Sequence, residues 1–222
     1  MKKFVRWIIG MLFYAGLPIL GWGVNDVNGY FQNESRMIYS VMIVVFTLGV
    51  VLFVPGESYP QRKGSKSLDY HKYSLALLQI LPIALLIGGP FSDRYDIWTI
   101  GEKELLRNVG LFLTSLGYFF MNWSFIALDK QFSVHITIQE GHKLITSGPY
   151  AIVRHPRYLG ILITFIGIAF VFRSLLALGI VGLILLVLIW RIRDEERLLS
   201  EQFGAEWDEY KERTSALLPF IY

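Results

Sequence analysis

The residues best suited to chemistry lie in two polar segments that flank a long apolar stretch near the C-terminus. The first runs from Ser147 to Gly160 and reads SGPYAIVRHPRYLG. The second runs from Arg191 to Gly204 and reads RIRDEERLLSEQFG. Imidazole and guanidinium groups offer hydrogen bonds, and carboxylates and aromatic faces favour a bound cation. Two such segments around one apolar hairpin predict a site that is half in water and half in lipid.

The composition excludes several other kinds of site. The 222 residues include no cysteine, so a thiolate nucleophile, a disulfide and a Cys-ligated metal are all impossible. The four histidines show no ligand spacing on one helix, and we therefore expect no metal. A net charge of +3 is too small to indicate a nucleic-acid partner. The glycine-rich phosphate-binding and dinucleotide-binding signatures are absent, as are H-E-x-x-H and G-x-S-x-G.

The elements that must position these residues are apolar helices. The chain is 54% hydrophobic and only 18% charged, and its charges are concentrated between apolar runs. These runs cover about residues 4–24, 37–54, 73–89, 105–128 and 159–190. The first run is long, and no small-residue cleavage site follows it, so we expect a retained anchor rather than a cleaved signal peptide. In the fourth run, Gly110, Thr114 and Gly117 have a spacing that permits close helix approach.

The last apolar run is too long for one membrane span. As a helix, residues 159–190 would extend about 48 Å, against roughly 30 Å of hydrocarbon. Arg173 and Ser174 lie near the middle of this run, where a charge inside lipid is costly. Two helices that turn at Arg173-Ser174 satisfy both constraints. We therefore expect an all-α polytopic membrane protein with about six transmembrane helices, of which the last two form a tight hairpin.

The distribution of basic residues predicts the orientation. With the N-terminus in the cytoplasm and six spans, sixteen of the 21 Lys and Arg residues lie on the inner side. Both termini and both polar segments would then be cytoplasmic. Alternating apolar residues from Val134 to Gln139 suggest a short strand. Leu199, Phe203, Trp207 and Tyr210 recur at near-helical spacing, which predicts a C-terminal amphipathic helix along the membrane surface or over the site.

The ordered motifs resemble those of the isoprenylcysteine carboxyl methyltransferase family. His142, Leu144, Ile145 and Ser147-Gly148-Pro149-Tyr150 are followed by Arg154-His155-Pro156, Tyr158 and Gly160. Arg191, Glu195-Glu196, Phe203-Gly204 and Tyr210 come next, and Leu218-Pro219-Phe220-Ile221 closes the series. The resemblance covers about residues 122–221, somewhat under half the chain. It divides the chain into N-terminal membrane helices, residues 1–104, and a catalytic membrane methyltransferase region, residues 105–222.

The resemblance implies an integral-membrane enzyme that transfers a methyl group from S-adenosylmethionine to a lipophilic or lipid-linked acceptor, with the lipid bilayer as its surroundings. An isoprenylcysteine carboxylate is one such acceptor; a phospholipid amine or a small lipophilic thiol or carboxylate would also suit the pocket. The implied cofactor contacts are His142, Leu144, Ile145, Tyr150, His155, Pro156, Tyr158 and Glu195. Arg191 and Glu195 are the implied catalytic pair. Arg191 and Arg154 would face the substrate, because a guanidinium group is well suited to hold a carboxylate.

Each of these assignments has a structural alternative. Arg191 and Glu195 are four residues apart, so they could form an ordinary helical ion pair. Arg154 and Arg157 could anchor the loop to anionic headgroups, and Tyr150 and Tyr158 could be interfacial aromatics.

Two other function classes also remain open. One is an NADPH-dependent membrane reductase of the sterol-reductase type, which shares the R-H-x-x-Y loop and a charged C-terminal segment with Trp and Tyr. The other is a non-catalytic transporter or scaffold, which would leave the polar segments unexplained.

Overall fold

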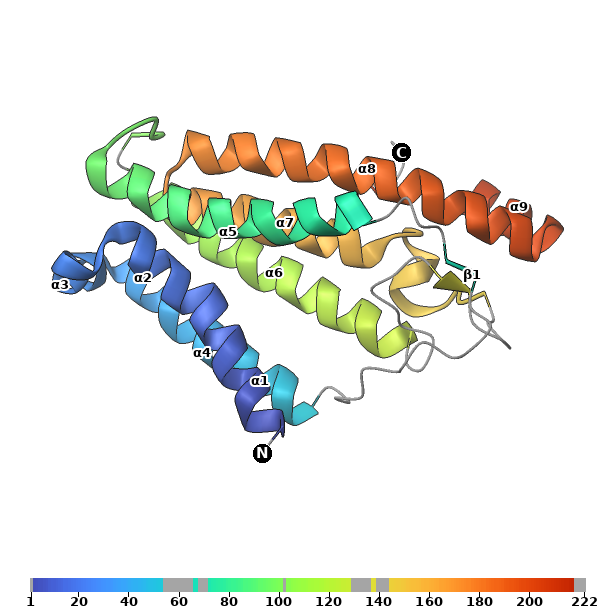
Figure 1. Cartoon of the computed structure of the whole chain (residues 1–222), viewed down its shortest axis with the longest axis horizontal. Helices are drawn as coiled ribbons and strands as arrows, with labels where there is room; N and C mark the ends of the chain where they lie inside the picture. Colours follow the sequence, from blue (N-terminus) through green and yellow to red (C-terminus); the bar gives the residue numbers. More distant parts are fainter. Residues whose placement is uncertain are drawn as a thin grey trace.

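The structure is a computed structural model that describes residues 2–53, 66–67, 72–101, 103–128, 137–138 and 144–217 (Figure 1). The N-terminal part consists of α1 (Lys2–Met11), the π-helical turn η1 (Leu12–Gly16), α2 (Leu17–Trp22), the 3-10 turn η2 (Val24–Asp26), α3 (Val27–Gln32) and α4 (Glu34–Phe53). The remaining helices are α5 (Lys72–Tyr95), α6 (Glu104–Leu128), the 3-10 turn η5 (Gly148–Ala151), α7 (Pro156–Val171), α8 (Leu175–Phe203) and α9 (Ala205–Arg213). Strands β1 (Lys66–Ser67) and β2 (Thr137–Ile138) pair antiparallel.

The expected all-α architecture is confirmed. Among the described residues, α5, α6 and α8 are long and apolar enough to cross a membrane. A fourth span results if the N-terminal helices are counted together, although these helices bend by 80° between Trp22 and Val24. Helix α7 is apolar but has only 16 residues, which corresponds to about 24 Å. The predicted total of six spans therefore stays a prediction.

The break between α7 and α8 lies where the sequence places it. Helix α7 ends at Val171, and α8 begins at Leu175. Ser174 caps α8 by accepting a hydrogen bond from the backbone N–H of Ala177 at 3.0 Å. Figure 1 shows the two helices running in opposite directions. The crossing of a bilayer by both helices, as a hairpin, stays a prediction.

Helices α6 and α7 lie in close contact, and this contact positions α7, which directly follows the first polar segment's loop. A Cβ atom on Gly110 would lie 2.6 Å from the carbonyl oxygen of Gly167, and one on Gly167 would lie 2.4 Å from the backbone nitrogen of Thr114. Farther along the pair, a Cβ on Gly160 would lie 2.8 Å from the carbonyl oxygen of Gly117. These separations leave room only for hydrogen, so the predicted close helix approach is confirmed.

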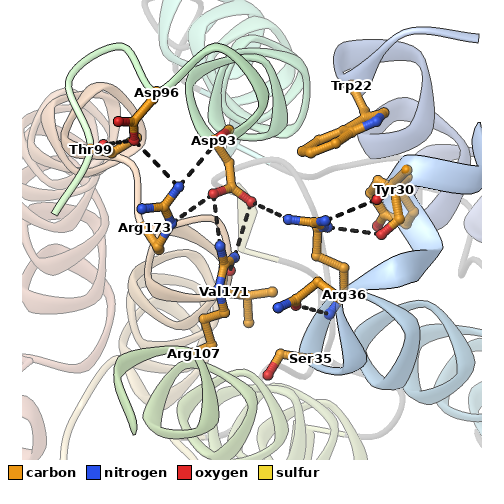
Figure 2. Close-up of polar contacts among 12 residues, drawn as sticks. Trp22, Tyr30, Ser35, Arg36, Asp93, Asp96, Thr99, Arg107, Val171 and Arg173 are labelled. Carbon is orange, nitrogen blue, oxygen red and sulfur yellow. Dashed lines mark hydrogen bonds and ion pairs between the residues drawn. The ribbon is translucent and has the colours of Figure 1, made fainter. Parts of the chain in front are cut away.

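One buried carboxylate, near the C-terminal end of α5, joins four parts of the chain (Figure 2). Asp93, near the end of α5, accepts hydrogen bonds from Arg36 of α4 at 2.9 Å, from Arg107 of α6 at 2.9 and 3.0 Å, and from Arg173 of the α7–α8 turn at 2.8 Å. All four residues are at least nine-tenths buried. They are called the Asp93 cluster below.

The Asp93 cluster holds three cations around one anion, and backbone carbonyl groups offset part of the surplus. Arg36 donates to the carbonyl oxygens of Tyr30 at 2.8 Å and Gly29 at 3.0 Å, both in α3. Arg107 donates to the carbonyl of Val171, the last residue of α7, at 2.5 Å. Carbonyls at a helix C-terminus carry partial negative charge, so these contacts favour guanidinium groups. The cluster therefore links α3 and α4 to the helices that carry the candidate site.

The C-terminal segment folds back onto the helical bundle. Gly204 has φ of +51°, a left-handed conformation that favours glycine, and it separates α8 from α9. Trp207 and Tyr210 of α9 are 2% and 4% exposed. The amphipathic pattern seen in the sequence is therefore divided between two helices, and its aromatic residues pack against the protein.

Candidate active site

The loop before α7 is held in shape by its own local sequence. Gly148 has φ of +62°, and Pro149 occupies the first turn of η5. Pro156 is the first residue of α7, a position at which the backbone N–H has no partner within the helix, so a proline costs no hydrogen bond there. Tyr150 is 8% exposed, which shows that the loop packs its aromatic residue inward.

A short C-terminal segment, residues 214–217, pairs with this loop and is called the C-terminal strap. The backbone N–H of Arg154 donates to the carbonyl of Ser215 at 2.9 Å, and that of His155 donates to the carbonyl of Ala216 at 3.0 Å. Tyr210, just before the strap, donates its hydroxyl to the carbonyl of Tyr150 at 2.7 Å. The loop is thus fixed from its outer side by residues about 60 positions later in the chain.

His155 lies between two carboxylates of α8. Its Nδ1 is 3.4 Å from Oε2 of Glu195, and its Nε2 is 3.3 Å from Oε1 of Glu196. Its ring stacks against Tyr158, with centroids 5.7 Å apart. Burial disfavours the charged imidazolium, but hydrogen bonds and charge from Glu195 and Glu196 outweigh burial and raise the pKa of His155.

A chain of polar contacts continues from Glu195 to α5. The Tyr158 hydroxyl donates to Oε1 of Glu195 and accepts from Nε of Arg191, which lies 3.2 Å away. Nη2 of Arg191 is 3.6 Å from Oε1 of Glu195. Nη1 of Arg191 donates to Oγ of Ser74 at 3.3 Å. Arg191 is only 3% exposed, so this guanidinium group is enclosed by protein.

Arg154 contacts Glu196 and the C-terminal part of the chain. Its Nε donates to Oε1 of Glu196 at 2.8 Å, and its Nη1 donates to the carbonyl groups of Lys211, at 3.2 Å, and Thr214. The Arg154 side chain is 8% exposed. Through these contacts, Arg154 links the loop to α8 and to the C-terminal strap. The substrate-facing role expected from the sequence stays a prediction.

The structure brings four of the expected site residues into one network: His155, Tyr158, Arg191 and Glu195. Pro156 and Tyr150 lie buried beside it. Leu144 and Ile145 are half-buried in the segment just before the loop. His142 lies outside the described residues.

Three contributors were not predicted as site residues. Glu196 belongs to the motif quoted from the sequence, but adjacent residues on a helix point about 100° apart, and only the path of the loop brings both carboxylates to His155. Tyr210 was expected on the apolar face of a C-terminal amphipathic helix, and not as a hydrogen-bond partner of the loop. For Ser74, no signal in the sequence indicates a contact with a residue 117 positions away.

The network offers the groups that an organic cation and an anionic acceptor require. Glu195 supplies a carboxylate with its side chain 23% exposed, and Tyr158 supplies an aromatic face. Arg191 supplies a planar guanidinium group on the same face of α8. Within the described part of the chain, no group of three or more His, Asp or Glu residues has a geometry that could hold a metal ion.

Comparison with known proteins relates this chain to a family of methyltransferases. The phospholipid methyltransferase family model matches residues 105–206. Protein-S-isoprenylcysteine O-methyltransferase B of Arabidopsis thaliana is 32% identical over 157 residues, which cover 67% of this chain and 78% of the relative. The protein-S-isoprenylcysteine O-methyltransferase of Saccharomyces cerevisiae is 30% identical over 178 residues, which cover 77% and 70%.

A solved structure shares the fold. It is that of the eukaryotic intramembrane Ras methyltransferase ICMT, which aligns with a TM-score of 0.50 at 16% identity and covers 97% of this chain and 98% of that chain. The apolar helices and this neighbour support an integral membrane protein. The named relatives support a methyltransferase and lend no support to the reductase alternative. This chain belongs to the protein-S-isoprenylcysteine O-methyltransferase family.

Proposed function

We propose that the protein transfers a methyl group from S-adenosylmethionine to a carboxylate on a lipophilic acceptor, of which an isoprenylcysteine is the prototype. The observation that carries this proposal is the network of His155, Glu195, Tyr158 and Arg191, which combines a cation-binding carboxylate with an acceptor-binding guanidinium group. The network lies at the ends of apolar helices, where a lipid-linked molecule and a water-soluble cofactor can meet.

The residues present fit such a cofactor. A carboxylate beside aromatic rings favours an onium cation, and Glu195 next to Tyr158 provides this pair. His155 carries ring nitrogens for a polar ligand, and Gly148 lets the loop backbone approach closely. When bound, S-adenosylmethionine would supply its methyl group to an acceptor oxygen as the carbon–sulfur bond breaks, which leaves a methyl ester and S-adenosylhomocysteine.

The protein's own part in this reaction is alignment and exclusion of water. A carboxylate acceptor is already deprotonated at neutral pH, so the transfer needs no general base. Arg191 donates through Nε to Tyr158 and through Nη1 to Ser74, and its Nη2 lies 3.6 Å from Glu195. An acceptor carboxylate bound beside Glu195 would pair with this guanidinium group. Burial of Arg191 strengthens such a pairing because little water competes for it.

The proposal includes an orientation and a division of the chain. The positive-inside distribution supports a cytoplasmic location of the loop, Glu195 and both termini. Residues 105–222 would form the methyltransferase region and residues 1–104 the N-terminal membrane helices. The match of the family model to residues 105–206 supports this division.

Two substitutions on one face of α8 test the proposal. Glu195→Gln should weaken S-adenosylmethionine binding by about 1–3 kcal/mol, the usual magnitude for one charge-assisted contact. Arg191→Lys keeps the charge but loses the planar fork, so it should spare cofactor affinity and impair turnover of an acidic acceptor. Calorimetric titration and a methyl-transfer assay measure the two effects.

Glu201→Gln is the matched control. Glu201 also lies on α8 and pairs with an arginine one turn away, Arg197, but its side chain is 59% exposed. The control should change neither cofactor affinity nor turnover. If Glu195→Gln and Arg191→Lys lowered thermal stability equally and left cofactor affinity unchanged, their ion pair would be purely structural and the proposed site would be wrong.

A further inference from the structure

Helix α5 reaches the candidate active site although it precedes the segment that the family model matches, residues 105–206. Its first turn carries Ser74, whose hydroxyl contacts Arg191 of α8. We propose that Ser74 is a positioning residue that orients the Arg191 guanidinium group toward the acceptor. We also propose that the Asp93 cluster holds α5 at the position along its axis that this contact requires. This inference rests on the proposed function, because it takes Arg191 as the acceptor-binding residue.

Each nitrogen of the Arg191 guanidinium group contacts a different residue. Nε donates to Tyr158 at 3.2 Å, Nη1 donates to Ser74 at 3.3 Å, and Nη2 lies 3.6 Å from Glu195. Contacts at Nε and Nη1 together fix the plane of the guanidinium group. Its third nitrogen is then directed toward Glu195 and the loop. Ser74 is 1% exposed, so its hydroxyl is in place before any ligand arrives.

Pre-set orientation has a direct benefit for acceptor binding. An arginine side chain loses rotamer entropy when it is ordered, and a residue that orders it beforehand removes part of that loss from the binding step. Alignment of the acceptor oxygen with the methyl group depends on the same plane. Loss of the Ser74 hydroxyl should therefore affect acceptor binding and turnover rather than cofactor binding.

The contact between Ser74 and Arg191 requires that α5 keep its position along its own axis. A slip of one residue would move Ser74 by about 1.5 Å and turn it by about 100° around the helix. Packing against α8 contributes to the register: a Cβ on Gly88 would lie 3.2 Å from Leu176 of α8. Apolar packing alone, however, discriminates weakly between neighbouring registers in a lipid environment.

The Asp93 cluster supplies a directional restraint at the far end of α5. Asp93 is 19 positions after Ser74, about 28 Å along the helix. Its two oxygens accept from Arg36, Arg107 and Arg173, which belong to three other parts of the chain (Figure 2). Charge-assisted hydrogen bonds are short and directional, and a buried carboxylate cannot exchange them for water. Helix α5 is thus fixed at one end and presents Ser74 at the other.

Steady-state kinetics of Ser74→Ala test the inference, with a prenylcysteine analogue that bears a free carboxylate as the acceptor. We expect a loss of about ten-fold in kcat/KM for this acceptor, at the lower end for a hydrogen bond to a charged group, because the guanidinium charge itself stays in place. The affinity for S-adenosylhomocysteine should stay within about two-fold. Ser74→Thr retains the hydroxyl and should restore most of the loss. Thr47→Val is the matched control, because the Thr47 hydroxyl is also buried and hydrogen-bonded, to the carbonyl groups of Ile43 and Val44, but belongs neither to the Arg191 network nor to the Asp93 cluster.

The outcomes separate this inference from the proposed function. Wild-type acceptor kinetics in Ser74→Ala, or an equal loss in Thr47→Val, would overturn the positioning role. Absence of methyl transfer by the wild-type protein would refute the proposed function instead. In that case a double-mutant cycle of Ser74→Ala and Arg191→Lys on the melting temperature still decides whether the two residues interact. Strictly additive shifts would overturn the inference, and a non-additive shift would support the contact.

Discussion

Replacement of Asp93 with asparagine should destabilise the protein far more than any surface charge change. The carboxylate accepts four hydrogen bonds from three guanidinium groups at 2.8–3.0 Å, and it is 4% exposed. Asparagine has nearly the same shape but no charge, so three buried cations would face one another without their shared anion. Removal of one partner of a buried ion pair costs about 3–5 kcal/mol. That is a fifth or more of the total stability of a typical domain, about 5–15 kcal/mol.

Asp96→Asn is the matched control for this prediction. Asp96 also pairs with Arg173, at 3.5 Å, but its side chain is 75% exposed. Exposed pairs contribute about 0–1 kcal/mol, so this variant should be close to the wild type. Unfolding of both variants in mild detergent by titration with sodium dodecyl sulfate measures the difference. Arg36→Leu added to Asp93→Asn should recover part of the loss, because it removes one uncompensated cation. Equally small losses for Asp93→Asn and Asp96→Asn would refute this account of the cluster.

Three further predictions concern packing, pH and topology. Gly167→Ala should destabilise the folded protein by about 1–3 kcal/mol in the same unfolding assay, because its Cβ would lie 2.4 Å from the α6 backbone. Its control is Gly182→Ala, which should be neutral or slightly stabilising because no atom lies within 4 Å of the added Cβ. Because the pKa of His155 is raised in the folded protein, its interaction with Glu195 and Glu196 should contribute fully below its ordinary pKa of 6.5 and be lost as the pH rises through the raised value. The melting temperature should fall over that range in the wild type and not in His155→Gln; parallel profiles would contradict this. Reporter fusions after Arg62 and Tyr222 should both indicate the cytoplasm and one near Arg94 the outside, whereas opposite signals at Arg62 and Tyr222 would contradict the even number of spans between them.

Periodic and length-limited features could be predicted from the sequence. The small residues Gly110, Thr114 and Gly117 recur on one face of a helix, and the structure places this face against α7. The break at Arg173-Ser174 was predicted from the thickness of a bilayer and the cost of a charge inside lipid, and α7 and α8 separate there. In both cases the physical constraint acts within one helix or one hairpin. The pattern is therefore visible locally.

Contacts between distant parts of the chain could not be predicted in this way. The six-span topology leaves Arg36, Arg107 and Arg173 among the five basic residues outside the inner sixteen. All three converge on Asp93, which is 57 positions after Arg36 and 80 before Arg173. The C-terminal strap pairs with the loop through backbone atoms, which no side-chain motif encodes. The number of spans was also beyond the sequence, because α7 has only 16 residues and the N-terminal helices bend by 80°.

The candidate site lies between these two cases. Arg191 and Glu195 share a helical face, so their proximity was visible in the sequence, and the structure places them 3.6 Å apart. Their surroundings come from other elements: His155 from the loop, and Ser74 from a helix more than 100 positions earlier. The motif could therefore indicate the residues involved but not the geometry that gives them a function.

Titration of the detergent-purified wild-type protein with S-adenosylhomocysteine and, separately, with NADPH tests the central claim most directly. Binding of the methyltransferase product to the network around Glu195 and His155 should give a saturable calorimetric signal and raise the melting temperature by mass action. NADPH should give neither effect. Stabilisation by NADPH with no binding of S-adenosylhomocysteine would contradict the proposed methyltransferase function.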